Sequence, residues 1–302
     1  MTSTTLDAAP ASGAGPAGRL SAFLYRHPRL RLGGLLTPPL FWLVVAYLAS
    51  LFALFVTAFW SVDTFTGALD RSFTLENFQE VFTTAVYRNL TWQTLAVALT
   101  VTLISALVAL PMGFYMAKVA GPRTRGFLLL AILTPLWASY LVKAYAWRGM
   151  VSPSGVLDWL LEPLGLNGPG FGVVAVILVE TYLWLPYMLL ATYAGFERLP
   201  NSLLEASGDL GASNGRTFRS VVLPMVLPAL VAGSIFTFSL TMGDYIAVGI
   251  VGGKFQTLGT AIYANVAGSA NQPLGAALSM IPVAIITIYL LLVRRTGALS
   301  EL

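Results

Sequence analysis

Six long apolar stretches constrain this chain more than any other feature of its sequence. A helix needs about 20 mostly apolar residues to cross the hydrocarbon core of a membrane. Stretches of this kind are predicted at residues 36–60, 94–117, 126–147, 172–196, 227–251 and 274–293. Only 10% of the chain is charged and 57% is hydrophobic, whereas a soluble domain carries about 25% charged residues. Lipid must therefore cover much of the exterior, and we expect an all-α membrane protein with six transmembrane helices.

The segment before the first predicted span has a different composition. Residues 1–18 are small, polar and rich in Pro and Gly, and the residues that follow them are basic. A segment of this composition buries too little apolar surface to become ordered. We therefore expect residues 1–35 to form a disordered, basic N-terminal segment, and residues 36–302 to form a single transmembrane domain.

Most of the seventeen Lys and Arg residues fall on one side of the predicted spans. They precede the first span, lie between the second and third and between the fourth and fifth, and follow the sixth. These residues are Arg19, Arg26, Arg29, Arg31, Lys118, Arg123, Arg125, Arg198, Arg216, Arg219, Arg294 and Arg295. Because short cytoplasmic loops carry the excess of Lys and Arg, we expect both termini to be cytoplasmic.

The residue types present argue against several classes of site. Cysteine is absent and His27 is the single histidine, so we expect no thiolate or histidine metal centre and no cysteine nucleophile. The Walker A pattern (G-x-x-x-x-G-K followed by Ser or Thr) does not occur, so we expect another protein to hydrolyse any ATP. The sequence also has no H-E-x-x-H motif and no Ser/His pair for an intramembrane enzyme. We therefore expect a chain with no catalytic residues.

The connection between the fourth and fifth spans is more patterned than a simple loop. Ser202 and Glu205 have the S-x-x-E spacing of a capping box, which predicts the start of a helix. Gly211 can end that helix, and Ser213 or Asn214 can cap a second short helix. The pattern predicts a helix–turn–helix that protrudes from the membrane and suits a groove on a partner. The alternative is a capped hairpin that lies on the membrane surface.

This loop, residues 197–224, resembles the signature loop of permeases in bacterial binding-protein-dependent ABC importers. That signature is Glu-Ala-Ala, three residues, Gly, nine residues, Ile, one residue and Leu-Pro. At the same spacing this sequence has Glu205, Ala206, Ser207, Gly211, Val221, Leu223 and Pro224, with Ser replacing Ala and Val replacing Ile. The resemblance implies the type I ABC importer permease fold in a bacterial inner membrane. It also implies that Glu205, Ala206, Ser207, Gly211, Leu223 and Pro224 couple the permease to an ATPase.

The same resemblance implies a larger assembly. ATP and Mg²⁺ would be bound by a separate dimer of ATP-binding cassette subunits, and this chain would hold no cofactor. The remaining partners would be a second homologous permease, an extracytoplasmic solute-binding protein and membrane lipid, with no nucleic acid. An ion-coupled secondary transporter is the alternative from another class, and it would be active without an ATPase.

Three further motifs resemble the spermidine/putrescine-type branch of these permeases. They are PLWASYLVKAYAW at 135–147, MGDYIAVGIVGG at 242–253 and NQPLGAALS at 271–279. This resemblance implies that the transported solute is a polyamine. The alternatives are an aminoethylphosphonate, an opine or ferric iron carried by the same architecture.

Two acidic residues fall inside predicted spans, where a charge is costly and indicates a function. Glu180 lies in the fourth span, and Asp244 lies near the outer end of the fifth. Carboxylates and aromatic rings are groups that bind ammonium. We therefore expect a substrate pathway lined by Glu180, Tyr182, Trp184, Asp244 and Tyr245. The alternatives are an ion pair between Asp244 and Lys143, and a buried helix–helix contact made by Glu180.

Overall fold

The computed structural model describes residues 28–63, 66–268 and 271–294, and it divides into two compact units between Val56 and Thr57. The first unit is apolar and helical where it is described. It consists of α2 (Pro28–Trp42), a π-helical turn (Leu43–Leu48) and most of α3 (Ala49–Thr57). Residues 32–57 form a candidate membrane span with a mean hydropathy of 2.3. The segment is apolar around its whole circumference, which is typical of a helix surrounded by lipid or by other membrane helices.

The boundary expected at residue 35 stays a prediction, and it falls inside a helix of the structure. A helix begins at Pro28, inside the segment 1–35 that we expected to be disordered, and residues 1–27 lie outside the described part of the chain. Leu and Arg favour helix, and Pro28 stands at the first position, where its missing N–H does no harm. The two compact units of the structure are divided near residue 56.

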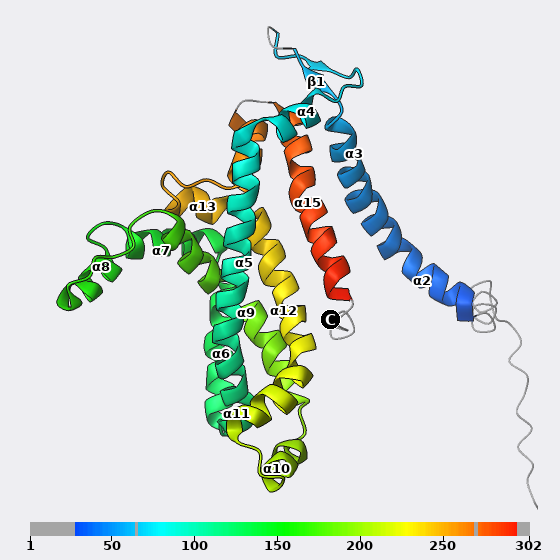
Figure 1. Ribbon diagram of the computed structural model, residues 1–302. Coiled ribbons are helices and arrows are strands. Elements are labelled where there is room, and N and C mark those ends of the chain that lie inside the picture. Colours follow the sequence, from blue (N-terminus) through cyan, green and yellow to red (C-terminus); the bar gives the residue numbers. More distant parts are fainter. Residues whose placement is uncertain (1–27, 64–65, 269–270, 295–302) are drawn as a thin grey trace, which may run out of the picture. The chain divides into compact units, whose positions relative to one another are not determined.

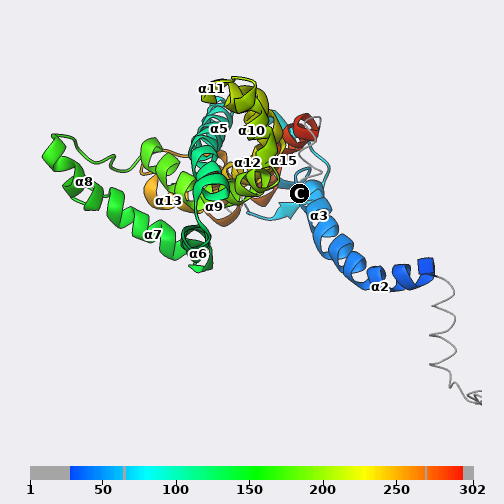
Figure 2. The same ribbon diagram turned by 90° about the horizontal axis from the view of Figure 1, so that it is seen from below.

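The second unit is built around three long helices that lie side by side (Figures 1 and 2). They are α5 (Ala85–Phe114), α9 (Val173–Glu197) and α12 (Leu223–Gly243), and each of them contacts the other two. Buried apolar side chains fill the space between them, including Met188 and Leu189 of α9. A fourth long helix, α15 (Gln272–Arg294), packs against α12 and against the short helices α4 (Glu76–Thr83) and α14 (Leu258–Tyr263).

Small residues let α9 and α12 approach each other closely. A Cβ atom added at Gly195 would lie 2.5 Å from the Cβ of Ala229, and one added at Gly233 would lie 3.0 Å from the Cα of Met188. Close backbone approach through Gly and Ala is the usual way in which membrane helices associate. We infer that these two helices form a tightly packed pair.

The prediction of one continuous third span at 126–147 was wrong. The segment consists of α6 (Pro122–Trp137) and α7 (Tyr140–Val151), which are bent by 100° at the break between them. Pro135 removes a backbone N–H near the end of α6, and both residues of the break have extended backbone. Beyond the break, α7 packs on α13 (Ile246–Val251). Contacts between distant segments therefore decide where this span bends.

The fifth span also differs from its expected bounds of 227–251. A continuous helical candidate span runs over residues 214–243, and α13 is a separate helix that begins at Ile246. Among the described residues, five helices are long and apolar enough to cross a membrane, and the bent pair α6–α7 makes six if it forms one span. A two-residue antiparallel ribbon pairs β1 (Ser61–Val62) with β2 (Leu69–Asp70).

Candidate functional site

Two short helices protrude from one end of the bundle of α5, α9 and α12 (Figure 1). They are α10 (Asn201–Asp209) and α11 (Asn214–Thr217), and a π-helical turn at Phe218–Val222 leads from α11 into α12. Gly211 has φ +74°, the left-handed conformation that glycine adopts most readily. The Ala212 N–H donates to the Ser207 carbonyl at 3.0 Å, and the Gly211 N–H donates to the Gly208 carbonyl at 2.8 Å. These two bonds form a Schellman motif that ends α10 at the glycine predicted to end it.

The predicted capping box at the start of α10 was wrong. The helix begins two residues earlier, at Asn201, with Pro200 in place of Ser202 at the N-cap and no side-chain capping bond. Ser202 and Glu205 are both exposed. Ser213 does stand at the N-cap of α11, again without a capping bond from its side chain. Pro200 has no side-chain acceptor for the first-turn N–H groups, and its carbonyl accepts the N–H of Leu203 at 3.2 Å.

One side of α10 is free and the other is held against the protein. Glu205 and Ala206 are exposed, and 88% of Leu210 is accessible to solvent. Ser207 is buried, and its hydroxyl lies 2.8 Å from the hydroxyl of Thr217 in α11. The free side is therefore available for a partner. The remaining signature residues, Leu223 and Pro224, form the first turn of α12.

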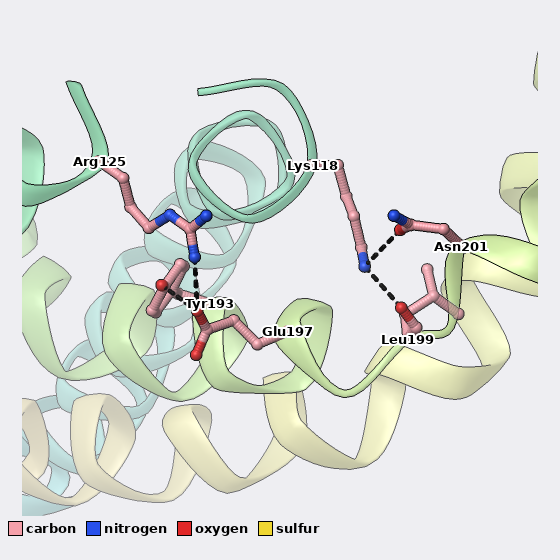
Figure 3. Close-up of polar contacts among 6 residues, drawn as sticks. All are labelled: Lys118, Arg125, Tyr193, Glu197, Leu199 and Asn201. Atoms are coloured by element: carbon pink, nitrogen blue, oxygen red, sulfur yellow. Dashed lines mark hydrogen bonds and ion pairs between the residues drawn. The ribbon is translucent and has the colours of Figure 1, made fainter. Parts of the chain in front are cut away.

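Polar contacts join the start of α10 to the ends of α5, α6 and α9 (Figure 3). The Lys118 ammonium donates to the Leu199 carbonyl at 2.5 Å and to Oδ1 of Asn201 at 3.1 Å. Arg125 forms an ion pair with Glu197 at 3.1 Å, and the Tyr193 hydroxyl donates to the same carboxylate. Sequence reasoning assigned Lys118 and Arg125 only to the positive side of the membrane. No pattern in the sequence indicates their partners, which lie more than 70 residues further along the chain.

A second cluster of functional groups surrounds Asp244 at the break between α12 and α13. Its Oδ1 accepts the N–H groups of Ile246 at 2.8 Å and Ala247 at 3.1 Å, and so caps the start of α13. Its Oδ2 accepts the hydroxyl of Tyr140, the first residue of α7. The structure shows no ion pair between Asp244 and Lys143 in the described part of the chain. Asp244 is thus held by hydrogen bonds instead of by the cation that we considered as its partner.

Asp244 borders a groove of about 320 Å³ that is rich in aromatic groups. Its lining consists of Tyr140, Trp184, Ser239, Leu240, Gly243, Asp244, Tyr245 and Ile246. The rings of Tyr140 and Trp184 stack with their centroids 5.8 Å apart, and Tyr245 stacks on Tyr263 at 4.7 Å. Three of the five predicted pathway residues, Trp184, Asp244 and Tyr245, therefore meet at one place.

The other two predicted pathway residues do not line this groove. Tyr182 is half-exposed, and its ring lies 5.4 Å from that of Trp147. Glu180 is 0% exposed, and within the described chain neither of its carboxylate oxygens has a hydrogen-bond partner. A residue on a path between two permease subunits should border an open groove, as Asp244 does although it is only 8% exposed, and Glu180 borders none of the described groove. The burial of Glu180 therefore favours the alternative that it lies in a helix–helix contact.

The sequence of this chain is similar to those of known membrane transport proteins. Residues 109–297 match the family described as "Binding-protein-dependent transport system inner membrane component". The chain is 40% identical over 300 residues to the inner membrane ABC transporter permease protein YdcU of Escherichia coli strain K12, covering 94% of this chain and 96% of that one. It is 32% identical over 212 residues to the spermidine/putrescine transport system permease protein PotB of Haemophilus influenzae, covering 68% and 73% of the two chains.

Solved structures show the same fold. A chain from a bacterial ABC transporter that imports the acidic polysaccharide alginate aligns with a TM-score of 0.68 at 16% identity, covering 92% of this chain and 99% of that one. A chain from the MetNI methionine ABC transporter aligns with a TM-score of 0.54 at 19% identity, covering 71% and 95%. The chain therefore has the type I permease fold and belongs to the family of binding-protein-dependent inner membrane components, the non-catalytic multi-pass permease subunits of ABC importers, in the branch related to PotB.

Proposed function

We propose that this permease forms half of the translocation path of an importer for polyamines such as spermidine and putrescine. The observation that carries the proposal is the groove in which Asp244 lies beside the rings of Trp184 and Tyr245. A carboxylate pairs with an ammonium group, and aromatic faces attract it through cation–π contact. One carboxylate binds one ammonium group, so the other amines of a polyamine would be met by the second permease.

The alternative solutes fit the groove less well. Aminoethylphosphonates and opines carry anionic groups that call for Lys or Arg, and no cationic side chain lines this groove. Ferric iron needs several oxygen or nitrogen ligands, and the described residues contain no group of three or more His, Cys, Asp or Glu side chains that could hold a metal ion. Similarity to PotB supports the same solute class, since that protein is named as a spermidine/putrescine permease.

We assign pathway lining to Trp184, Asp244 and Tyr245, and a structural role to Glu180. A translocation path must be accessible to water from one side of the membrane and then from the other. Within this cluster, the groove is the part that is open. Glu180 faces the interior formed by the chain's own helices. Tyr182 is assigned a packing role beside Trp147.

The free side of α10 is the proposed docking surface for an ATP-binding cassette dimer, which would bind the ATP and Mg²⁺. Glu205, Ala206 and Gly211 are exposed there, as the coupling role requires. Arg216 and Arg219 line a shallow groove at α11 and the turn that follows it, which supports a cytoplasmic position for this end of the bundle. The distribution of Lys and Arg along the sequence supports the same position for both termini. The binding protein would then deliver solute to the opposite end.

The test is uptake of labelled spermidine and putrescine into proteoliposomes that contain this permease with the second permease, the ATPase and the binding protein. Asp244→Asn keeps the capping oxygen but removes the charge, and we expect uptake to fall by about tenfold or more because a charge-assisted contact is lost. Asp70→Asn, a change at an exposed carboxylate remote from the groove, should leave uptake intact.

Two results would contradict the proposal. If the complex hydrolyses ATP but accumulates neither polyamine, the importer assignment stands and the polyamine assignment fails. If this chain accumulates polyamine without the ATPase, the chain works as an ion-coupled secondary transporter and the coupling role of α10 fails.

A further inference from the structure

The helix proposed to dock the ATPase is attached to the rest of the permease at both of its ends. At its start, Lys118 bonds the carbonyl of Leu199 and the side chain of Asn201, on either side of Pro200 (Figure 3). At its end, Ser207 bonds Thr217. Lys118 belongs to the segment that continues α5, and Thr217 directly precedes the turn that leads into α12. The two attachments therefore connect α10 to two different long helices.

The position of Lys118 depends on a π-helical turn, Tyr115–Val119, at the end of α5. In this turn the Ala120 N–H donates to the carbonyl of Tyr115 at 2.8 Å. The extra residue of a π-turn rotates the residues that follow it by about 100° relative to a regular helix. Lys118 lies inside this turn, so its side chain is directed differently than it would be in a regular continuation of α5. Isolated π-turns of this kind are frequently found at functional sites.

Lys118 makes the strongest of the contacts at the start of α10. An ammonium group has three donors, and here two of them meet acceptors that flank Pro200. Leu199 is only 2% exposed, so its carbonyl is shielded from water on one side. The neighbouring ion pair between Arg125 and Glu197 is 36% and 44% exposed, and exposed pairs contribute little.

Ser207 occupies the third signature position, where the family pattern has Ala. Ser differs from Ala by one hydroxyl group. The oxygen of this group, Oγ of Ser207, lies 2.8 Å from Oγ1 of Thr217. The departure from the family pattern thus supplies a bond between α10 and α11 that alanine could not make. The bond is largely shielded, because Ser207 is 9% exposed.

We propose that Lys118 and Ser207 are positioning residues that transmit movement of α10 to α5 and to α12. The inference rests on the proposed coupling function of α10. An ATPase that pulls or pushes the free side of α10 moves the membrane helices through the connecting chain, through the packing of Leu204 against the apolar cluster below it, and through the polar contacts that hold both ends of α10. Lys118 fixes the start of the helix to α5, and Ser207 fixes its end to the segment that enters α12. Loss of either contact weakens the connection between α10 and the attached helix, so that less of the movement of α10 reaches it.

The experiment measures solute imported per ATP hydrolysed by the complete transporter in proteoliposomes. Lys118→Met removes the donors and keeps the length of the side chain, and the ratio should fall on the order of tenfold, as expected for a lost charge-assisted hydrogen bond. Ser207→Ala removes a neutral hydrogen bond and should lower the ratio by about two- to tenfold. Lys118→Arg keeps the charge and the donors, so the solute imported per ATP should stay close to the wild-type value. Arg123→Met, which removes an exposed cation near the start of α6, is the matched control.

The imported solute per ATP distinguishes a loss of movement between α10 and the membrane helices from a loss of ATPase binding. In the Lys118→Met transporter the ATPase should remain bound and should still hydrolyse ATP. An unchanged ratio in Lys118→Met would overturn the inference, and so would a fall in uptake that is matched by loss of the ATPase from the complex. If variants on the free side of α10, such as Glu205→Ala, leave both ATPase binding and uptake unchanged, the proposed coupling function itself fails, which is a different result.

Discussion

A Leu210→Ala variant is expected to weaken binding of the ATPase to the permease. Leu210 is the C-cap residue of α10, and 88% of its surface is exposed. Full burial of a leucine side chain contributes about 1.5–3 kcal/mol. Because nearly all of this surface remains to be buried, truncation should cost about 1–3 kcal/mol of binding free energy, which is a roughly 5- to 150-fold increase in Kd.

The assay is a titration of purified ATPase against the permease pair in nanodiscs, with Kd measured by biolayer interferometry. Leu164→Ala is the matched control. Leu164 is also highly exposed, at 71%, but it lies in the short 3-10 turn Glu162–Leu164 on the proposed outer side. The effect of Leu210→Ala should persist at high salt, because apolar burial is not screened as charge pairs are.

The reasoning is refuted if the two variants bind the ATPase equally well. Equal loss in both would mean that leucine truncation disturbs the permease in general. No loss in either would mean that the exposed end of α10 does not enter the interface, and the docking surface would have to be sought elsewhere. A loss confined to Leu164→Ala would reverse the proposed orientation of the bundle.

Two further predictions concern the interior. Gly195→Ala is expected to lower Tm in detergent, because the added Cβ would lie 2.5 Å from that of Ala229. Overpacking of this kind costs about 1–3 kcal/mol. The control is Gly126→Ala, whose added Cβ meets no atom within 4 Å and which should not lower Tm. Glu180→Gln is expected to keep or raise Tm and to leave polyamine uptake intact, because a buried carboxylate without a partner is more costly than an amide of the same size. Loss of uptake in this variant would place Glu180 on the solute path.

Features that depend on local composition were predictable from the sequence. An apolar stretch of membrane-spanning length is recognisable wherever it occurs, and the structure has helices in all six predicted regions. The signature loop was also recognisable, because fixed spacing between Glu205, Gly211 and Pro224 needs no knowledge of the fold. The end of α10 at Gly211 follows from the one residue type that readily adopts a positive φ.

Features that depend on distant contacts were not predictable. The bend after Trp137 lies in an apolar stretch that reads as continuous, and α7 is held in its bent position by Tyr140, which donates to Asp244. Arg148 adds a bond to the carbonyl of Ile250 at 3.0 Å. Each of these pairs is separated by more than 100 residues, so no pattern of spacing along the chain reports them.

Asp244 has a structural role at two helix breaks and a proposed role in binding the solute, and the two roles involve the same carboxylate. Its carboxylate caps α13 and accepts the Tyr140 hydroxyl, so it holds two helix breaks together. It also borders the groove that we propose for the ammonium group. A cation that reaches this carboxylate competes with Tyr140 for the same oxygen atoms. Solute binding at the groove would therefore change the contact between α7 and α13.

The two proposed sites are joined by α12 and by the second half of α9, and this placement gives a physical route between them. α12 follows the turn that begins after Thr217, the residue that bonds α10, and it ends at the residue before Asp244. Its 21 residues span about 30 Å. α9 carries Trp184 in the groove and ends at Glu197, next to the contacts of Lys118. Because the backbones of the two helices approach closely at Gly195 and at Gly233, we expect them to move together as one rigid body. A displacement of α10 would then reach the groove without any change of secondary structure along the way.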